Sequence, residues 1–218
     1  MDQGDLQSEV SWRGGVPVST RFEDPYFSLR DGLAETTHVF LRGNDLPARL
    51  IDGFHVAELG FGTGLNALAT LNAWTGEGTF RFTSFEANPM EAADMARALS
   101  EWPSLPRDAL ITAWASGARQ FTIGPMQVEV IIGDVAETLP HWEGLADAWY
   151  LDGFSPAKNE AMWTQPLMSE VWTHTAEGGT FATYTAASHV RSRLKEAGFT
   201  VTRQAGFGHK RHMTTGVK

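Results

Sequence analysis

The most informative stretch of the sequence is a glycine-rich loop within AELGFGTGLNALAT, residues 57–70. Gly60, Gly62 and Gly64 alternate there, directly after an apolar run and before a helix-like pattern. Such a loop between a strand and a helix lets the backbone approach a ligand closely. A dinucleotide-binding loop would have the spacing G-x-G-x-x-G and hold a pyrophosphate at the start of the helix. Here the third glycine comes one place early and Glu58 precedes the loop, which favours a phosphate-free ligand that carries an ammonium group.

Three further acids follow predicted strands and suit the same kind of ligand. Glu86 ends the second strand, 22 residues after Gly64, where a carboxylate accepts hydrogen bonds from two ribose hydroxyls. Asp134 follows the third strand and is suited to an adenine amino group, and Asp152 follows the fourth, beside the expected reacting centre. Each acid alone is typical of a cap or turn, but four of them around successive strand ends predict one site. S-adenosylmethionine fits this site because it has an amino-acid moiety, a sulfonium charge and no phosphate. Asn66, just after the loop, is also predicted to bind this cofactor.

The elements that must position these residues alternate between strand and helix, which predicts a mostly parallel sheet with helices on both faces and an antiparallel C-terminal edge. Residues up to about Arg49 show no sustained period and are expected to supply a short strand pair and a lid. Residues 103–125 have no clear pattern, and a helix from residue 159 is expected to run until Gly178 and Gly179 stop it. The predicted strands cover residues 54–59, 80–86, 126–134, 146–154 and 180–185, with a final strand pair around residues 206–208.

Composition narrows the class of protein. The chain has 218 residues, 42% of them apolar, which fits one α/β-sized domain. No run approaches the roughly 18 apolar residues of a membrane span, and the N-terminus lacks the pattern of a signal peptide, so we expect a soluble cytoplasmic protein with no membrane partner. Because the chain has no cysteine, disulfides, thiolate metal sites and cysteine nucleophiles are excluded. His209 and His212 have no third ligand nearby, so no metal is expected.

The charge is distributed unevenly along the chain. The net charge is −9, yet residues 189–218 hold seven Lys or Arg against one acid, Glu196, and therefore carry +6. The other 188 residues hold 10 basic and 25 acidic side chains and carry −15. This asymmetry suggests a nucleic-acid-facing edge on an acidic body. The alternative is that these side chains form an ordinary solvated surface.

Several motifs together resemble a known family. They are FEDPYFS, GLAETTHVFLRGN, ELGFGTGLN, DAWYLDGFSPAKNEAMWTQPL, GGTFATYTA and AGFTVTRQAGFGHKRHMTTG. From about residue 17 to 217 the chain resembles the methyltransferase domain of the bacterial bifunctional tRNA 5-methylaminomethyl-2-thiouridine biosynthesis proteins. LDGFSPAKN and GFGHKRHM are the most specific pieces.

The resemblance implies a Rossmann-like class I S-adenosylmethionine-dependent methyltransferase with a mostly parallel seven-stranded sheet. Residues 1–50 would be an N-terminal extension or lid, and residues 51–218 the catalytic domain. The implied reaction is methylation of the amine of 5-aminomethyl-(2-thio)uridine at the wobble position of tRNA, with S-adenosylhomocysteine as the other product. The family also has a flavin-dependent oxidase domain, and no second dinucleotide fingerprint follows here. We therefore expect no FAD in this chain and, if it acts alone, a separate FAD-dependent oxidase that supplies the aminomethyl form.

The same resemblance suggests roles for individual residues. Asp152 is predicted to orient the amine rather than to abstract its proton, and Phe154 either to stack on the extruded uracil or to fill the core beneath its turn. Tyr26 and Phe27 are predicted to fold over the cofactor. The residues expected to contact phosphates of the anticodon arm are Lys158, Lys210 and Arg211.

Three other functions stay open at this stage. A nicotinamide-dependent oxidoreductase could use the same sheet order, although the glycine spacing and Glu58 disfavour it. The chain could instead act on another amine substrate, as a methyltransferase or as an aminopropyltransferase that uses the decarboxylated cofactor. A non-catalytic RNA-binding module is the third, and the complete set of acids argues against it.

Overall fold

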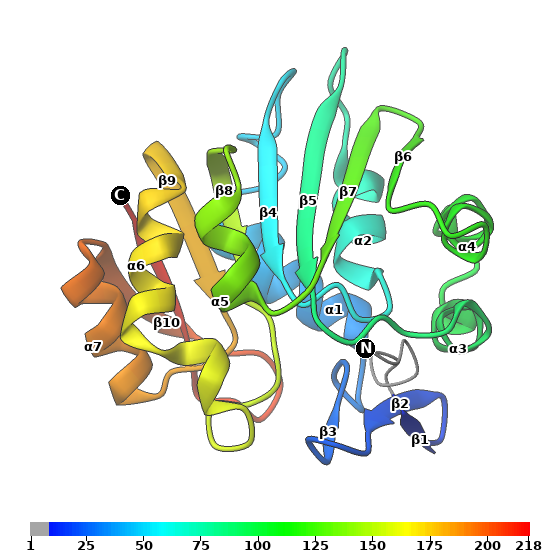
Figure 1. Cartoon of the computed structure of the whole chain (residues 1–218), viewed down its shortest axis with the longest axis horizontal. Coiled ribbons are helices and arrows are strands. Elements are labelled where there is room, and N and C mark those ends of the chain that lie inside the picture. The colour runs from blue at the N-terminus through cyan, green and yellow to red at the C-terminus, as the bar shows by residue number, and fades with distance from the viewer. Residues whose placement is uncertain (1–8) are drawn as a thin grey trace.

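A computed structural model describes residues 9–218, which form an eight-stranded sheet with helices on both faces and a small three-stranded sheet beside it (Figure 1). The strand order in the large sheet is β10-β11-β9-β8-β4-β5-β7-β6. Its strands are β4 (His55–Leu59), β5 (Phe80–Glu86), β6 (Gln120–Ile123), β7 (Met126–Ile132), β8 (Ala146–Tyr150), β9 (Thr175–Thr183), β10 (Thr200–Ala205) and β11 (His212–Val217).

The five central strands, from β9 to β7, are parallel, while β10, β11 and β6 pair antiparallel at the two edges. The chain first builds outward from β4 through β5 to β7 and then returns to add β8 and β9 on the other side of β4. Ligands bind at such a switch point, outside the carboxyl ends of the strands. The fold therefore places the candidate site beyond the ends of β4, β5 and β8.

The mixed sheet with an antiparallel C-terminal edge confirms the predicted fold class, but the sheet has eight strands instead of seven. The additional strand is β6, which forms a hairpin with β7 through Gly124 and Pro125. It is four residues long and only Ile123 in it is buried, so it has little hydrophobic periodicity. For this reason the sequence pattern did not reveal β6. Helix α4 (Arg107–Ala115) was also missed, because only Leu110 and Trp114 in it are buried.

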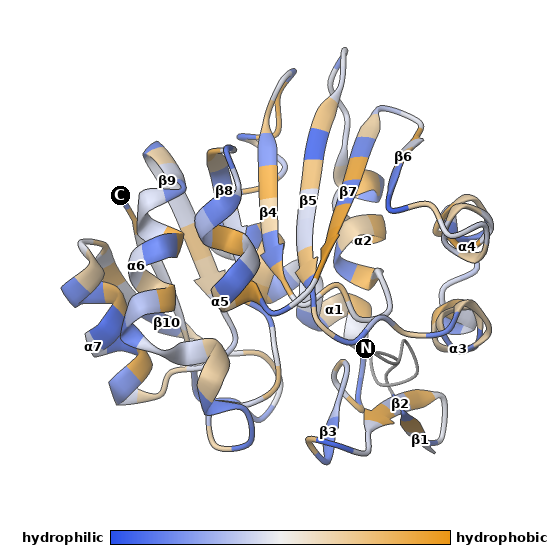
Figure 2. Cartoon of the chain, in the orientation of Figure 1, coloured by the Kyte–Doolittle hydropathy of each residue, from blue (hydrophilic) through white to orange (hydrophobic). Residues whose placement is uncertain are grey.

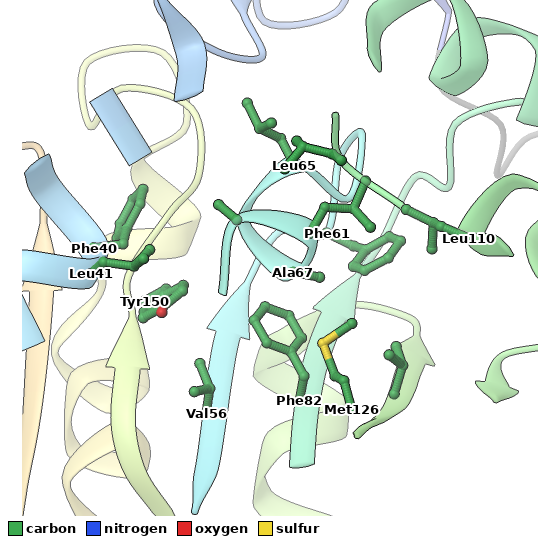
Figure 3. Packing of buried hydrophobic residues seen from close by; sticks show 14 of the residues in the cluster. Phe40, Leu41, Val56, Phe61, Leu65, Ala67, Phe82, Leu110, Met126 and Tyr150 are labelled. Carbon is green, nitrogen blue, oxygen red and sulfur yellow. The ribbon is translucent and has the colours of Figure 1, made fainter. Parts of the chain in front are cut away.

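Two buried clusters lie on the two faces of the sheet. On one face α5 (Val135–Thr138), α6 (Gln165–Thr173) and α7 (Ser188–Ala197) cover a cluster that includes Phe85, Trp149 and Phe181. On the other face α2 (Leu65–Ala73), α3 (Ala92–Ala98) and α4 cover the larger cluster. Figure 3 shows Val56 and Phe82 of the sheet facing Ala67 of α2. In Figure 2 hydrophobic colour runs along β7, whereas much of α7 is hydrophilic, as expected for an amphipathic surface helix.

The N-terminal part is more regular than predicted. Strands β1 (Val10–Arg13), β2 (Val16–Ser19) and β3 (Asp24–Pro25) form the small sheet, which lies near the carboxyl ends of the central strands (Figure 1). Helical turns follow as α1 (Gly32–Thr36), a π-helical turn (Thr37–Leu41) and a 3-10 turn (Arg42–Asn44). The short strand pair expected in this stretch is present as β1 and β2, while β3 and the helical turns were not predicted. Asp31 caps α1, and Phe40 stacks on Tyr150 of β8 at 5.2 Å between ring centroids, so tertiary packing holds these short turns.

A second correction concerns the end of α6. The helix ends at Thr173, and β9 begins at Thr175, so Gly178 and Gly179 lie inside a strand and do not stop a helix. Thr175 pairs with Ala146 of β8, and the register shifts before Ala148. The pairing with β8 overrides the helical pattern of the sequence. Within residues 9–218 no helix has the length and apolar character needed to cross a membrane.

Candidate active site

A cleft of about 960 Å³ opens where the sequence predicted the ligand, at the carboxyl ends of the central strands. It is lined by segments that are far apart in the chain: the glycine loop, the ends of β5, β7 and β8, the β2–β3 region and the turn between β10 and β11. Predicted site residues that line it are Tyr26, Phe27, Gly60, Gly62, Asn66, Glu86, Asp134, Asp152, Phe154 and Lys210. Glu58, Gly64, Lys158 and Arg211 lie outside this lining.

The glycine loop needs its glycines for two different reasons. Gly60 and Gly62 have φ angles of +89° and +52°, a region that side chains with a Cβ adopt at a cost. A Cβ on Gly62 would lie 3.1 Å from the ring of Tyr26, so the loop and the N-terminal segment approach closely here. Gly64 begins α2 with φ +78°, and a Cβ there would collide with Leu110 at 2.6 Å. Gly64 therefore serves helix packing, and direct contact of Gly64 with a ligand is not supported.

Glu58 is placed differently from the prediction. It lies within β4, is fully buried and does not reach the cleft. Its carboxyl accepts hydrogen bonds from Asn66 Nδ2 and from Ser84 Oγ, each at 2.8 Å. Burial, and next the charge of Asp152, raise the pKa of Glu58 well above its ordinary value. Glu58 therefore supports the floor of the site through Asn66 and does not itself meet an ammonium group.

Asn66 joins this buried acid to the acid in the cleft. Its Nδ2 donates to Glu58 and also to Asp152 Oδ2 at 2.8 Å, while its Oδ1 accepts from Thr36 Oγ1 at 2.7 Å. The amide nitrogen donates two hydrogen bonds and the amide oxygen accepts one, so the side chain is fixed in orientation. Asn66 thereby ties α1, β4 and the segment after β8 together under the cleft.

Asp152 follows β8 and is half-buried at the centre of the lining. Its carboxyl accepts hydrogen bonds from Asn66 and from the backbone N–H of Gly153. Burial raises the pKa of Asp152 to about 7, against the opposing effect of those two hydrogen bonds. A carboxyl with this pKa exchanges a proton near neutral pH, which is the property of a general acid or base.

Glu86 and Asp134 occupy the cleft as predicted but have different environments. Glu86 is buried, and its carboxyl accepts hydrogen bonds from the backbone N–H groups of Gly62 and Asn88 at 2.9 and 2.7 Å. Burial raises the pKa of Glu86, and these hydrogen bonds oppose that effect. Asp134 is exposed and caps α5 by accepting from the Ala136 N–H at 2.9 Å. Glu86 therefore also shapes the glycine loop.

Phe154 forms an aromatic cluster with residues of the N-terminal segment. Its ring stacks on Phe22 at 4.7 Å and meets the edge of Tyr26 at 5.1 Å, measured between ring centroids. All three side chains line the cleft. The sequence analysis did not identify Phe22. Phe27 also borders the cleft, but its ring is buried against Trp102 and packs into the core.

The basic residues predicted to contact phosphates are partly engaged within the protein. The ammonium of Lys158 binds the backbone oxygen of Glu23 and the carboxylate of Asp24, and that of Lys210 binds Glu35 at 2.9 Å. Arg211 is exposed. Elsewhere in the basic C-terminal segment, Arg193 donates to a backbone oxygen, and Lys218 donates to two. Much of the +6 charge of residues 189–218 is thus used in holding the fold.

Two further cleft residues were missed by the sequence analysis, namely Glu35 and Tyr184. Glu35 lies in α1, and Tyr184 directly follows β9. The rule that located Asp152, a polar residue just after a parallel strand, applies equally to Tyr184. Nothing local distinguishes Glu35 from an ordinary acid in the first turn of a helix.

The residues that line the cleft fit S-adenosylmethionine. Six acids line the cleft against three Lys or Arg, which disfavours a pyrophosphate and suits a cationic ligand. Gly60 and Gly62 leave room for backbone contact, and Glu86 follows β5 where a ribose is bound in related sheets. Among residues 9–218 no group of three or more His, Asp or Glu side chains is placed to hold a metal ion.

The sheet order and this cleft define a class, the Rossmann-like methyltransferases that use S-adenosylmethionine. The chain belongs to a family described as S-adenosyl-L-methionine-dependent methyltransferase, whose sequence model matches residues 99–218. The nicotinamide-dependent and aminopropyl-transferring alternatives lose their support with this result.

Individual relatives are more specific. The chain is 43% identical to the tRNA 5-methylaminomethyl-2-thiouridine biosynthesis bifunctional protein MnmC of Caulobacter vibrioides, and the match covers 94% of the chain but 37% of that protein. The protein of the same name from Marinobacter nauticus is 39% identical, with 96% and 36% covered. The chain thus spans little more than a third of the length of these curated relatives. Among solved structures, MNMC2 from Aquifex aeolicus has a TM-score of 0.75 at 22% identity and covers 99% of this chain and 72% of its own, which supports the fold.

Proposed function

We propose that this protein methylates the amine of 5-aminomethyl-(2-thio)uridine at the wobble position of tRNA. The observation that carries the proposal is the 43% identity, over 94% of this chain, to a protein named for the biosynthesis of tRNA 5-methylaminomethyl-2-thiouridine. The cleft agrees in its chemistry, because an acid with a pKa near 7 lies at its centre. A separate FAD-dependent oxidase, or a further part of a longer protein, would supply the aminomethyl substrate. A cytoplasmic location follows from the tRNA substrate.

The acceptor amine has to present a lone pair, and this requirement defines the work of Asp152. A lysine-like amine with a pKa of ~10.4 is almost entirely protonated at pH 7. The ionised carboxylate of Asp152 accepts an N–H hydrogen bond and so orients the nitrogen. We extend the role predicted from the sequence, which was orientation alone: because burial raises the pKa of Asp152 to about 7, the same group also receives the proton that the nitrogen loses. The cofactor supplies a methyl group on a positively charged sulfur. We assign its binding to Gly60, Gly62, Glu86 and Asp134, with Tyr26 above the loop.

The base has to leave its stack to reach this position, and the aromatic cluster suits it. Phe22 lies against one face of Phe154 in a stacked arrangement. An extruded uracil that takes the place of Phe22 would gain the same stacking surface. Since Phe22 belongs to the turn between β2 and β3, the N-terminal segment would act as the lid over the acceptor.

The test is transfer of a labelled methyl group to tRNA from cells that lack this modification step, followed by digestion to nucleosides. We expect label on the C5 substituent of the wobble uridine. Asp152→Ala should keep the affinity for S-adenosylmethionine within a few-fold and lose most of the turnover, because the orienting carboxylate is absent. Label on another nucleoside, or none on tRNA, would refute the proposed substrate, and near-normal turnover of the alanine variant would refute the role of Asp152.

A further inference from the structure

An ammonium group of the protein itself lies in the cleft. The Nζ of Lys210 is 2.9 Å from Glu35 Oε1 and 4.1 Å from the centroid of the Tyr184 ring. Asp152 is close enough that Lys210 lowers and Glu35 raises the pKa of its carboxyl. These four side chains come from four separate segments of the chain and all line the cleft. They bring a cation, two carboxyls and an aromatic face together beside the predicted reacting centre.

The groups around this cation are held firmly. Glu35 lies in α1, whose first turn is capped by the Asp31 side chain, and only 13% of the Glu35 side chain is exposed. The Tyr184 hydroxyl donates to the backbone oxygen of Gly153 at 2.7 Å, which fixes the ring beside Asp152. A carboxylate combined with an aromatic face is an arrangement that binds ammonium groups. The surroundings of the cation are therefore a preformed ammonium site.

The cation itself is easier to move. Lys210 stands in the turn between β10 and β11, and 47% of its side chain is exposed. Its ammonium is carried on a flexible four-carbon stem, and a half-exposed ion pair of this kind contributes little to stability. Another ammonium group that enters the cleft can replace it without disturbing the fold.

We propose that Glu35, the ring of Tyr184 and Asp152 form the subsite that recognises the ammonium group of the acceptor, and that Lys210 occupies this subsite until the acceptor displaces it. The inference rests on the proposed function in one respect, since it takes the acceptor to be a primary amine. It adds a specificity element, because a hydroxyl analogue of the same size carries no charge for the subsite. It also gives Lys210 a second position, in which the displaced side chain is free to meet a tRNA phosphate.

The probe is 5-aminomethyluridine, a nucleoside without phosphates, titrated into the protein in the presence of S-adenosylhomocysteine so that binding is measured without turnover. Lys210→Met keeps the length of the side chain but removes the competing charge, so the dissociation constant should fall by about two- to fivefold. Glu35→Gln in the Lys210→Met background should raise it by roughly tenfold, because a charge-assisted hydrogen bond is lost. Lys195→Met is the matched control, since Lys195 is exposed on α7 and lies outside the cleft lining.

A neutral probe makes the test specific for the ammonium group. Binding of 5-hydroxymethyluridine should not differ between the protein, Lys210→Met and the double variant by more than about twofold. An unchanged or weaker affinity of Lys210→Met for the aminomethyl nucleoside would overturn the inference, as would no binding to any form. Equal gains for both nucleosides would also overturn it, because Lys210 would then act by bulk alone.

The same proteins are assayed for methyl transfer to tRNA, which separates the two proposals. If the predicted pattern of binding is found but no methyl group reaches the wobble uridine, the ammonium subsite stands and the proposed substrate is refuted. If tRNA is methylated as proposed while Lys210→Met leaves nucleoside binding unchanged, the proposed function stands and the subsite is refuted.

Discussion

The Asn66 hydrogen bond opposes the effect of burial on the pKa of Asp152, and replacement of Asn66 by alanine gives a prediction with a defined dependence on pH. The Asn66 amide donates a 2.8 Å hydrogen bond to the Asp152 carboxylate and stabilises its ionised form. A hydrogen bond to a charged group contributes about 1.5–3 kcal/mol, and one pKa unit corresponds to about 1.4 kcal/mol. Removing the bond should therefore raise the pKa of Asp152 from about 7 to roughly 8–9.

The loss of activity should then shrink as the pH rises. At pH 7 about half of Asp152 is ionised in the unchanged protein, against roughly 1–10% in Asn66→Ala, so turnover should fall about 5- to 50-fold. At pH 9 Asp152 is almost fully ionised in the unchanged protein and about 50–90% ionised in Asn66→Ala, so the difference should be within about twofold. The quantity to measure is the ratio of the two kcat values at each pH, because the titration of the acceptor amine cancels in it.

Ser84→Ala serves as the control for this experiment. It removes the hydrogen bond from Ser84 to the buried Glu58 but leaves the contact between Asn66 and Asp152 in place. Its kcat ratio to the unchanged protein should not vary with pH. Thermal melting and the affinity for S-adenosylmethionine are recorded for both variants, since Asn66 is buried. A constant ratio for Asn66→Ala between pH 6.5 and 9 would show that Asn66 acts on the fold and not through the ionisation of Asp152.

Two further predictions concern the loop and the far end of the sheet. Gly62→Ala and Gly14→Ala both place a Cβ at positive φ and should each lose about 1–2 kcal/mol of stability. Only Gly62→Ala should lose S-adenosylmethionine affinity, by tenfold or more in calorimetry, because its Cβ enters the contact with Tyr26 while Gly14 has open space. Equal affinities of the two variants would contradict the assigned role of the loop. His55 is buried, and burial followed by the charge of Arg81 lowers its pKa to about 4, so the stability that neutral His55 contributes is complete above pH 6.5 and is lost as the pH falls towards 4. Between pH 7 and 4.5, urea unfolding of the protein should lose about 2–3 kcal/mol more than that of His55→Phe, and parallel losses would exclude His55 as the cause.

The position of the site could be predicted from the sequence because its signals are local. The alternation of strand and helix predicts where parallel strands end, and acids at those ends meet at one edge of the sheet. Glu86, Asp134 and Asp152 were located in this way, and the glycine spacing together with Glu58 indicated the class of cofactor. The specific motifs, LDGFSPAKN among them, indicated the family.

The direction and partners of side chains were decided by the tertiary structure. All five residues of β4 are buried because helices cover both faces of the sheet, so no alternation in the sequence tells that Glu58 points into the core and not into the cleft. Glu35 and Lys210 are 175 residues apart and meet only because α1 and the β10–β11 turn are both folded over the strand ends. Phe22 reaches Phe154 for the same reason. Local patterns determine which residues follow which strand, whereas contacts between distant segments depend on how the whole sheet is assembled.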